Sequence, residues 1–451
     1  MTPAAQQTDD SPATRENLTE LFRQAETAPE KFLIGAESEK IGVHTETGAP
    51  LEYSGDFSVG RVFSGLVRAH GWEPFGEVEG GPVLGLKRAG ASITLEPGAQ
   101  FELSGAPLPD LHAVAAEQAQ HYAELEPITR EMGLTWLMTG FHPLARLSDL
   151  PWVPKQRYPI MREYLPTQGS GALDMMQRTA TVQANFDWSS EADGMRKMRV
   201  ALRLSPLLQA MFANAPFLEG RASELLSQRG NVWLHMDPSR SGLIAPLWDT
   251  AEPGYQHYVD WALDAGMFLF RRNGRLLENT GQSFAEFMRD GFEGERATIG
   301  DFRLHLTTLF PEVRLKNTLE VRSCDNLPPE LALSAIALWT GVLYDDAALG
   351  QAESLTEACT FEGYRAVRPE LIRRGLATKL WGRVGWEWAE RLLDIARGGL
   401  ERRARRDGAG ADERIYLAPS VELVARRAHP ADDALQRFSA GDSILEATRL
   451  R

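Results

Sequence analysis

ITLEPGAQFELS, residues 93–104, alternates apolar and polar side chains along its whole length. The odd positions, from Ile93 to Leu103, are apolar, whereas the even positions are polar or small and include Glu96 and Glu102. This period of two is typical of a β-strand with one buried face. Pro97-Gly98 predicts a bend or bulge within the strand, which would let the two glutamates converge on one point.

The same design recurs in four other segments of the chain. They are KFLIGAESEKIGV (31–43), TATVQANFDWSS (179–190), NVWLHMD (231–237) and TLEVRSCD (318–325). A single strand of this kind is more often an edge strand with a solvated face. Five of them together predict an antiparallel sheet whose apolar face is covered by helices and whose concave face is polar.

This polar face gathers the glutamates of the predicted strands into what we call the carboxylate basin. Its members are Glu37, Glu39, Glu96, Glu102 and Glu320. Carboxylates that lie a few ångströms apart repel one another strongly, so they need cations nearby. Oxygen ligands without a Cys or His cluster favour Mg²⁺ or Mn²⁺ over zinc, and such ions commonly serve phosphate groups.

The remaining patterns predict an α+β fold, a curved antiparallel sheet with helices on its outer face. Residues 1–13 read as a disordered tail, and residues 14–451 as a single domain that is mainly helical from about residue 328. Helices are expected near 17–28, 107–133 and 192–213. Residues 144–172 combine Pro and Gly with Trp and Tyr, which predicts an ordered, irregular loop that walls the site.

Composition limits the partners and the location. The 48 basic and 62 acidic residues give a net charge of −14, which argues against nucleic acid and anionic membranes as partners. Only two cysteines occur, so a cytoplasmic location is expected, and the chain lacks both a signal-peptide pattern and an apolar run of the roughly 18 residues that span a bilayer. We expect a monomer or a homodimer.

Other chemistries find weaker support in the sequence. It contains no P-loop, Rossmann or H-E-x-x-H motif. Paired carboxylates also serve glycoside hydrolysis, but Arg322, two residues from Glu320, suits a site for metal and phosphate better. Cys324 is expected to be an inert, partly buried thiol, and the arginines of 402–406 to form a solvated helix face.

Several longer segments carry a specific resemblance. GAESEKIGV, ITLEPGAQFELSGAPL, LDMMQRTATVQANFDWSSE, LTTLFPEVRLKNTLEVRSCD and GLERR, in this order, resemble the plant-type glutamate–cysteine ligases of plants and many bacteria. The resemblance covers roughly residues 30–430. It implies a glutamine-synthetase-like catalytic fold that binds ATP and metal ions on the concave face of the sheet. The implied reaction joins the γ-carboxylate of L-glutamate to the amine of L-cysteine through γ-glutamyl phosphate, the first step of glutathione synthesis.

The resemblance also implies roles for individual residues. The five basin glutamates match the metal ligands of the family, Gln183 a polar metal or phosphate contact, and Arg322 the arginine at the nucleotide phosphates. Arg178 and Arg229 are candidates for contacts with a substrate carboxylate or the acyl phosphate, which suit a planar guanidinium. For Arg178, an ion pair with a basin carboxylate is an equal alternative.

The chain also departs from the plant pattern. Ser38 and Ala180 stand where many plant members have His and Cys, and two cysteines cannot form two regulatory disulfides. Three rival functions stay open: a related ligase with another amine acceptor or acyl donor, a metal-dependent or carboxylate-pair hydrolase, and a non-catalytic metal- or nucleotide-binding relative.

Overall fold

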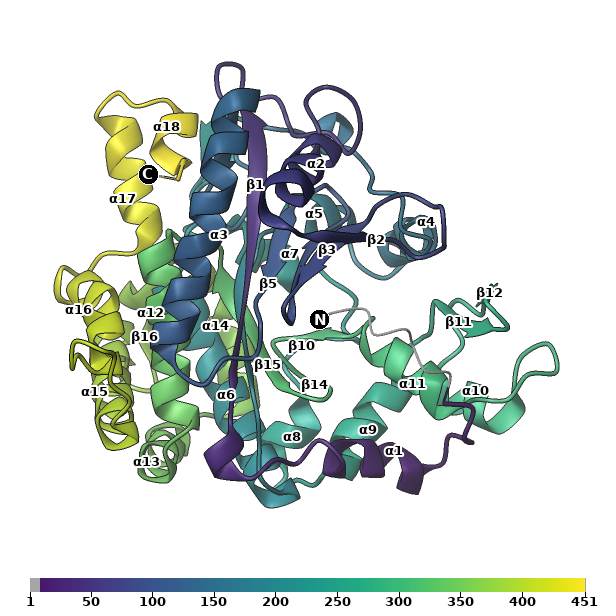
Figure 1. The fold of residues 1–451 in the computed structure, drawn as a ribbon. Helices are drawn as coiled ribbons and strands as arrows, with labels where there is room; N and C mark the ends of the chain where they lie inside the picture. Colours follow the sequence, from purple (N-terminus) through teal and green to yellow (C-terminus); the bar gives the residue numbers. More distant parts are fainter. Residues whose placement is uncertain (1–8, 451) are drawn as a thin grey trace.

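One antiparallel sheet of nine strands organises the computed structural model, which describes residues 9–450 (Figure 1). The strand order is β14-β15-β7-β1-β5-β4-β3-β2, and β6 pairs with the far half of β1. The strands are β1 (Ile34–His44), β2 (Glu73–Phe75), β3 (Gly85–Arg88), β4 (Ala91–Leu95), β5 (Phe101–Ser104), β6 (Leu134–Leu137), β7 (Thr181–Phe186), β14 (Val313–Leu315) and β15 (Leu319–Asp325). The predicted antiparallel sheet is therefore confirmed.

The stretch 93–104 is not the single bent strand predicted from its alternation. It forms a hairpin, in which β4 and β5 pair with Leu95 opposite Phe101 and Thr94 opposite Glu102. The reversal lies at Pro97-Gly98, where Ala99 adopts a φ of 65° and its N–H donates to the carbonyl of Glu96. Proline followed by glycine favours a chain reversal at least as strongly as a bulge.

The segment NVWLHMD, residues 231–237, is mostly helical rather than a strand. Helix α7 (Gln228–Leu234) begins at Ser227, whose hydroxyl accepts from the N–H of Gly230. A serine N-cap of this kind stabilises a helix start, and it outweighs a period-two pattern that covers only seven residues. The polar face therefore comes from β1, the β4–β5 hairpin, β7 and β15.

Helices cover the apolar side of the sheet. Figure 1 shows α3, α12 and α15 on one side of the long strand β1, and α9–α11 with the β11–β12 hairpin on the other. The helices are α1 (Arg15–Arg23), α2 (Val59–His70), α3 (Leu111–Met132), α4 (Arg157–Tyr164), α5 (Ala172–Arg178), α6 (Glu191–Met211), α7 (Gln228–Leu234), α8 (Ala245–Asp249), α9 (Tyr255–Asp264), α10 (Phe284–Asp290), α11 (Ile299–Leu306), α12 (Pro329–Leu343), α13 (Asp346–Thr356), α14 (Phe361–Arg374), α15 (Gly385–Arg403), α16 (Ala418–Ala425), α17 (Pro430–Ser439) and α18 (Ile444–Thr448).

Short elements complete the fold. The 3₁₀ turns are η1 (Pro29–Lys31), η2 (Leu147–Asp149), η3 (Leu165–Thr167), η4 (Gly375–Ala377) and η5 (Glu413–Leu417). The two-stranded ribbons are β8 (Phe217–Leu218) with β9 (Arg221–Ala222), β10 (Ser241–Gly242) with β13 (Phe310–Pro311), β11 (Leu269–Arg272) with β12 (Arg275–Glu278), and β16 (Lys379–Leu380) with β17 (Arg383–Val384). Within residues 9–450 no single helix is long and apolar enough to cross a membrane, although α12 and α13, bent by 95°, pass that test as a pair.

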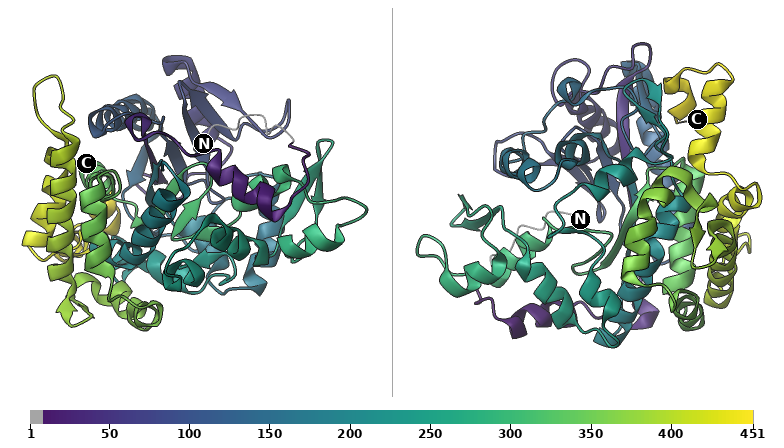
Figure 2. Two further views of the ribbon diagram at one scale, coloured as in Figure 1. Left: turned by 90° about the horizontal axis from the view of Figure 1, so that it is seen from below. Right: turned by 180° about the vertical axis from the view of Figure 1, so that it is seen from behind.

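Both ends of the described chain are attached to the fold. Of the predicted disordered tail, residues 1–8 lie outside the described residues. In the rest of it, the N–H of Ala13 donates to the carbonyl of Ala297, and the carbonyl of Ser11 accepts from Ile299. At the other end, α17 and α18 lie beside the top of the sheet (Figure 2), where the N–H of Leu450 donates to the carbonyl of Trp136.

Helices α12 and α15 approach each other closely enough to require glycine at their contact. A Cβ on Gly399 would lie 1.8 Å from the carbonyl oxygen of Gly341. We expect Gly399→Ala to lower the free energy of unfolding by about 1–3 kcal/mol, because the helices must move apart. Chemical denaturation of the variant measures this loss. Gly408→Ala is the control, since its Cβ would enter open space; equal stability of the two variants would contradict the packing argument.

Candidate functional site

The sheet register places the predicted basin glutamates on one face. Glu37 of β1 lies between Ser104 of β5 and Gln183 of β7, and Glu39 lies opposite Glu102. Glu96 follows β4 directly, and on β15 Glu320 lies opposite Asn185 of β7. Side chains of directly paired residues share a face of the sheet. The structure therefore brings Glu37, Glu39, Glu96, Glu102 and Glu320 together.

Burial and mutual repulsion raise the pKa values of the two glutamates on β1. For Glu39, burial and then the charges of Glu96 and Glu102 raise the pKa well above its ordinary value. For Glu37, burial and then Glu320 and Glu102 raise the pKa to about 7. Glu102 thus contributes to both shifts, together with Glu96 for Glu39 and with Glu320 for Glu37. These two pairs, Glu39 with Glu96 and Glu37 with Glu320, are the two groups of carboxylates in the basin.

Hydrogen bonds hold these carboxylates in place from β7. The N–H of Thr181 donates to Oε2 of Glu39 over 2.9 Å, and Nδ2 of Asn185 donates to Oε1 of Glu37 over 2.8 Å. Gln183 lies between these two residues on the strand, with its Nε2 3.5 Å from Oε1 of Glu39. Strand β7 therefore orients the glutamates of β1 through polar side chains and its own backbone.

Glu320 differs from the other four because cationic side chains surround it. Nε of Arg314 lies 2.6 Å from its Oε2, Nη1 of Arg322 3.2 Å and Nζ of Lys316 3.7 Å. Burial acts to raise the pKa of Glu320, but these three cations hold it well below its ordinary value. Three positive charges around one carboxylate form a cationic cluster at one end of the basin, and such a cluster suits phosphate oxygens.

Arg314 and Lys316 are site residues that the sequence reasoning missed. They alternate in the segment VRLK, and Arg314 lies opposite Glu320 across the β14–β15 ladder. Arg314 and Lys316 stand two residues apart just before the predicted strand TLEVRSCD. This spacing predicts a neighbouring strand with both cations on one face. Arg322, which the sequence did indicate, donates from Nη1 to Oε1 of Gln183 over 2.6 Å. Gln183 thus connects the cationic cluster to Glu39.

Arg229 lies at the edge of the site and binds the backbone of β15. Its Nη1 donates to the carbonyl of Ser323 over 3.0 Å and its Nη2 to that of Arg322 over 2.7 Å. At these two residues the register of β15 against β7 shifts, as in a β-bulge. The guanidinium therefore binds two carbonyls of β15 at the place where the ladder is interrupted. Its Nη1 also lies 3.7 Å from Oδ1 of Asp325.

Arg178 is buried but faces other partners than the basin. Its Nη1 donates to Oδ1 of Asp174 over 3.1 Å and to Oε1 of Glu219 over 3.3 Å, and its guanidinium lies 4.6 Å from the ring centre of Phe141. An ion pair does form, but the alternative of a pair with a basin carboxylate is wrong. Glu219 reaches Arg178 from the β8–β9 turn, which is distant in sequence.

The loop 144–172 supplies further site residues next to Glu96. A small cavity of about 40 Å³ is lined by Glu96, Arg157, Tyr158, Met161 and Phe310, among others. Lys155 donates from Nζ to the carbonyl of Leu95 over 2.6 Å, and burial lowers its pKa to about 8. The loop contains α4 and two 3₁₀ turns, so it is more regular than predicted, and it does wall the site.

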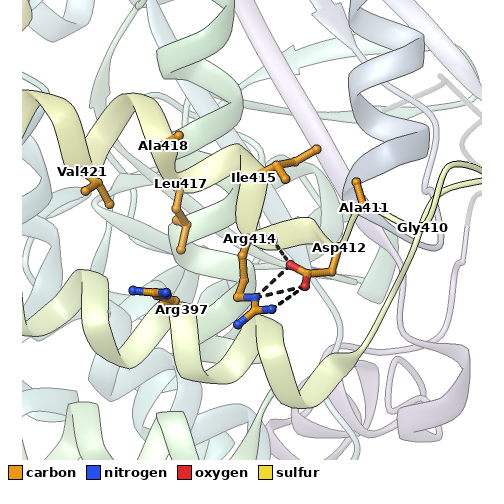
Figure 3. Close-up of a pocket in the computed structure, with 9 residues that line it drawn as sticks. All are labelled: Arg397, Gly410, Ala411, Asp412, Arg414, Ile415, Leu417, Ala418 and Val421. Carbon is orange, nitrogen blue, oxygen red and sulfur yellow. Dashed lines mark hydrogen bonds and ion pairs between the residues drawn. The ribbon is translucent and has the colours of Figure 1, made fainter.

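A larger cavity lies in the C-terminal helical part (Figure 3). Its volume is about 510 Å³, and residues of α15, η5 and α16 line it, including Arg397, Ile415 and Val421. Arg414 faces Asp412 at its edge and donates to that carboxylate from Nε and Nη2. This groove is larger than the cavity beside Glu96. The basin is nevertheless the better candidate for the functional site, because buried charged side chains are concentrated there.

The donor set of the basin fits a hard divalent cation. In the described part of the chain, no three Asp, Glu, His or Cys side chains are already gathered around one metal position. Glu37, Glu39, Glu96 and Glu102 nevertheless supply oxygen donors only, and their repulsion is what a bound cation relieves. Glu320 fits this role less well, because Arg314, Lys316 and Arg322 already neutralise it.

Comparison with known proteins gives consistent matches. The model of glutamate–cysteine ligase family 2 matches residues 33–449. The chain is 39% identical over 438 residues to the chloroplastic glutamate–cysteine ligase of Brassica juncea, covering 96% of this chain and 83% of that protein. It is 40% identical over 430 residues to the chloroplastic glutamate–cysteine ligase B of Oryza sativa subsp. japonica, covering 95% and 84%.

A solved structure supports the fold. The structure of the glutamate–cysteine ligase of Francisella tularensis in complex with AMP superposes with a TM-score of 0.57 at 14% identity, covering 92% of this chain and 87% of that one. The predicted fold class is thereby confirmed. The predicted cytoplasmic location is wrong, because the curated relatives are named as chloroplastic enzymes and two cysteines do not identify a compartment. Since both the family model and these relatives match nearly the whole chain, the protein belongs to glutamate–cysteine ligase family 2.

Proposed function

We propose that this protein joins the γ-carboxylate of L-glutamate to the amine of L-cysteine at the expense of ATP. The observation that carries the proposal is the pairing of two opposite charge clusters on one face of the sheet. The glutamates of β1 and of the β4–β5 hairpin share this face with Glu320 and its three cationic partners, Arg314, Lys316 and Arg322. A ligase that uses ATP needs both, because it must hold metal ions and polyphosphate at one place.

The basin glutamates have the role of holding Mg²⁺. We assign Glu39, Glu96, Glu102 and Glu37 to metal binding, with Mn²⁺ as a substitute, and Glu320 to the orientation of the cationic cluster. Bound Mg²⁺ supplies charge neutralisation at the phosphate oxygens. Glu102 affects both groups of carboxylates, so we infer that it serves more than one ion position.

The cationic cluster acts on the transferred phosphoryl group. A γ-carboxylate oxygen of glutamate attacks the terminal phosphorus of ATP, the bond to ADP breaks, and γ-glutamyl phosphate forms. Arg322, with Arg314 and Lys316, stabilises the negative charge on the phosphoryl oxygens. Gln183, held by Arg322, contacts phosphate or metal.

The second half of the reaction needs the acceptor held beside the acyl phosphate. The cysteine amine attacks the acyl carbon, phosphate leaves, and the amine loses a proton. Arg157 lies with Met161 beside Glu96, and we assign its guanidinium to the carboxylate of a substrate amino acid. Arg229 and Arg178 stay candidates for substrate contacts, Arg178 only if a substrate carboxylate replaces Asp174 or Glu219.

One assay tests the proposal and separates it from its rivals. ADP release is measured with MgATP and glutamate, with and without each of a series of amino acids and small amines. We expect release that depends on cysteine. Dependence on another amine would indicate a different acceptor. Absence of ADP release with every amine would contradict a ligase. Nucleotide binding measured in that case would indicate a non-catalytic relative, and bond hydrolysis without ATP a hydrolase. Arg397→Ala, in the larger cavity, is the control variant and should retain full activity.

A further inference from the structure

The turn between β4 and β5 carries Glu96 into the basin. The N–H of Glu96 donates to the carbonyl of Gln100 over 3.0 Å, and the N–H of Ala99 donates to the carbonyl of Glu96 over 3.0 Å. Ala99 has a φ of 65°, in the left-handed region that costs free energy for a residue with a Cβ. The turn therefore needs support from its surroundings to keep this shape.

Gln100 provides that support through its side chain, which is only 3% exposed. Its Oε1 accepts from the N–H of Gly98 over 2.8 Å. Its Nε2 donates to the carbonyl of Thr179 over 2.9 Å and to that of Met176 over 3.3 Å. A side-chain amide offers one acceptor and two donors, and here both ends bind the backbone.

The same hydrogen bonds connect the turn to the segment between α5 and β7. Met176 lies in α5 and Thr179 just before β7, the strand that orients Glu37 and Glu39. The fit is close, because a Cβ on Gly98 would lie 2.3 Å from the carbonyl oxygen of Gln177. The N–H of Val153 also donates to the carbonyl of Pro97 over 2.9 Å. Gln100 thus fixes the distance between the turn with Glu96 and the start of β7.

We propose that Gln100 is a positioning residue, which holds the carboxylate of Glu96 at its place in the metal-binding basin without contacting metal or substrate. This inference rests on the proposed function, since it assigns Glu96 to metal binding. Without the amide, the N–H of Gly98 and the carbonyls of Met176 and Thr179 lose a buried partner. The turn then relaxes toward other partners, and Glu96 moves with it. Residues that orient metal ligands in this way typically contribute 10- to 100-fold to metal affinity.

The test uses Gln100→Met, which keeps the length but removes the amide, and Gln100→Asn, which keeps the amide but is one methylene too short. Mn²⁺ binding to the full chain without substrates is measured by electron paramagnetic resonance. We expect at least about tenfold weaker binding for Gln100→Met, with Gln100→Asn between it and the parent. The Mg²⁺ concentration for half-maximal ADP release should rise to a similar extent, while KM for cysteine changes less than about twofold.

Asn214→Leu is the matched control. Asn214 is also buried, and its Nδ2 joins two backbone carbonyls, those of Met138 and Asn326, at 2.8 Å each. Its loss should lower the melting temperature and leave Mn²⁺ affinity unchanged. The inference is overturned if Gln100→Met and Gln100→Asn bind Mn²⁺ as tightly as the parent protein. If the parent itself binds no Mn²⁺, the assignment of the basin to metal fails first, and the role of Gln100 fails with it.

Discussion

Glu102→Gln is expected to lower kcat by at least about 10²-fold, because a metal ligand that loses its charge forfeits several kcal/mol of transition-state stabilisation. Glu102 is the carboxylate whose charge acts on both Glu37 and Glu39, so its loss affects both groups of the basin. Glutamine keeps the size of the side chain and an oxygen that can accept from the hydroxyl of Thr94. The loss is therefore one of charge, with little change of packing.

The stability of the same variant gives a second, independent readout. Glu102 raises the pKa values of Glu37 and Glu39, which means that its charge destabilises theirs in the folded protein. Removal of that charge should leave the melting temperature without metal unchanged or higher, and reduce the rise that Mg²⁺ produces. Differential scanning fluorimetry with and without Mg²⁺, beside steady-state ADP release, measures both effects.

Glu413→Gln provides the opposite pattern as a control. Glu413 is fully buried, accepts from the N–H of Leu111 over 2.8 Å and pairs with Arg403, far from the basin. Its substitution should lower the melting temperature and leave kcat unchanged. If Glu102→Gln behaved like Glu413→Gln, with lost stability and full Mg²⁺-dependent activity, Glu102 would be a structural residue and the metal assignment of the basin would be wrong.

The alternation of side chains was sufficient to predict the polar face, even where it misjudged the strand. In the β4–β5 hairpin, Ile93 pairs with Leu103 and Leu95 with Phe101. The two residues of each pair therefore both have odd numbers or both have even numbers. The period of two therefore continues across the turn without a break. Alternation alone cannot distinguish such a hairpin from one bent strand, but it assigns Glu96 and Glu102 to the same face in both cases.

Partners that come from distant parts of the chain were beyond the sequence. Arg178 pairs with Glu219 from a turn 41 residues later, and nothing local to either residue indicates the contact. Helix α7 was missed for a different reason, because Ser227, its N-cap, lay outside the seven residues whose alternation was read as a strand. Arg229 lies in this helix and binds the carbonyls of the bulge in β15. The sequence around Arg229 does not indicate this contact either.

Arg322→Met is the second variant for which a large effect is expected, a decrease of about 10²–10³-fold in kcat. Arg322 is the member of the cationic cluster that contacts both Glu320 and Gln183, so it lies between the cluster and the metal-binding glutamates. Negative charge grows on the phosphoryl oxygens during transfer, and a guanidinium in a buried site stabilises that charge more than the ground state.

The comparison with Arg314→Met separates this role from simple charge balance. Arg314 binds Glu320 through two nitrogens, at 2.6 and 3.1 Å, and also donates to the carbonyl of Leu309. Its loss should therefore reduce stability most, because it leaves Glu320 with weaker partners, whereas loss of Arg322 leaves that bidentate pair intact. Kinetics over a range of ATP concentrations, with melting temperatures, measure the difference. Equal kinetic losses, each in proportion to lost stability, would show that Arg322 only balances the charge of Glu320. A decrease in kcat for Arg322→Met at near-normal stability would place its guanidinium at the transferred phosphoryl group.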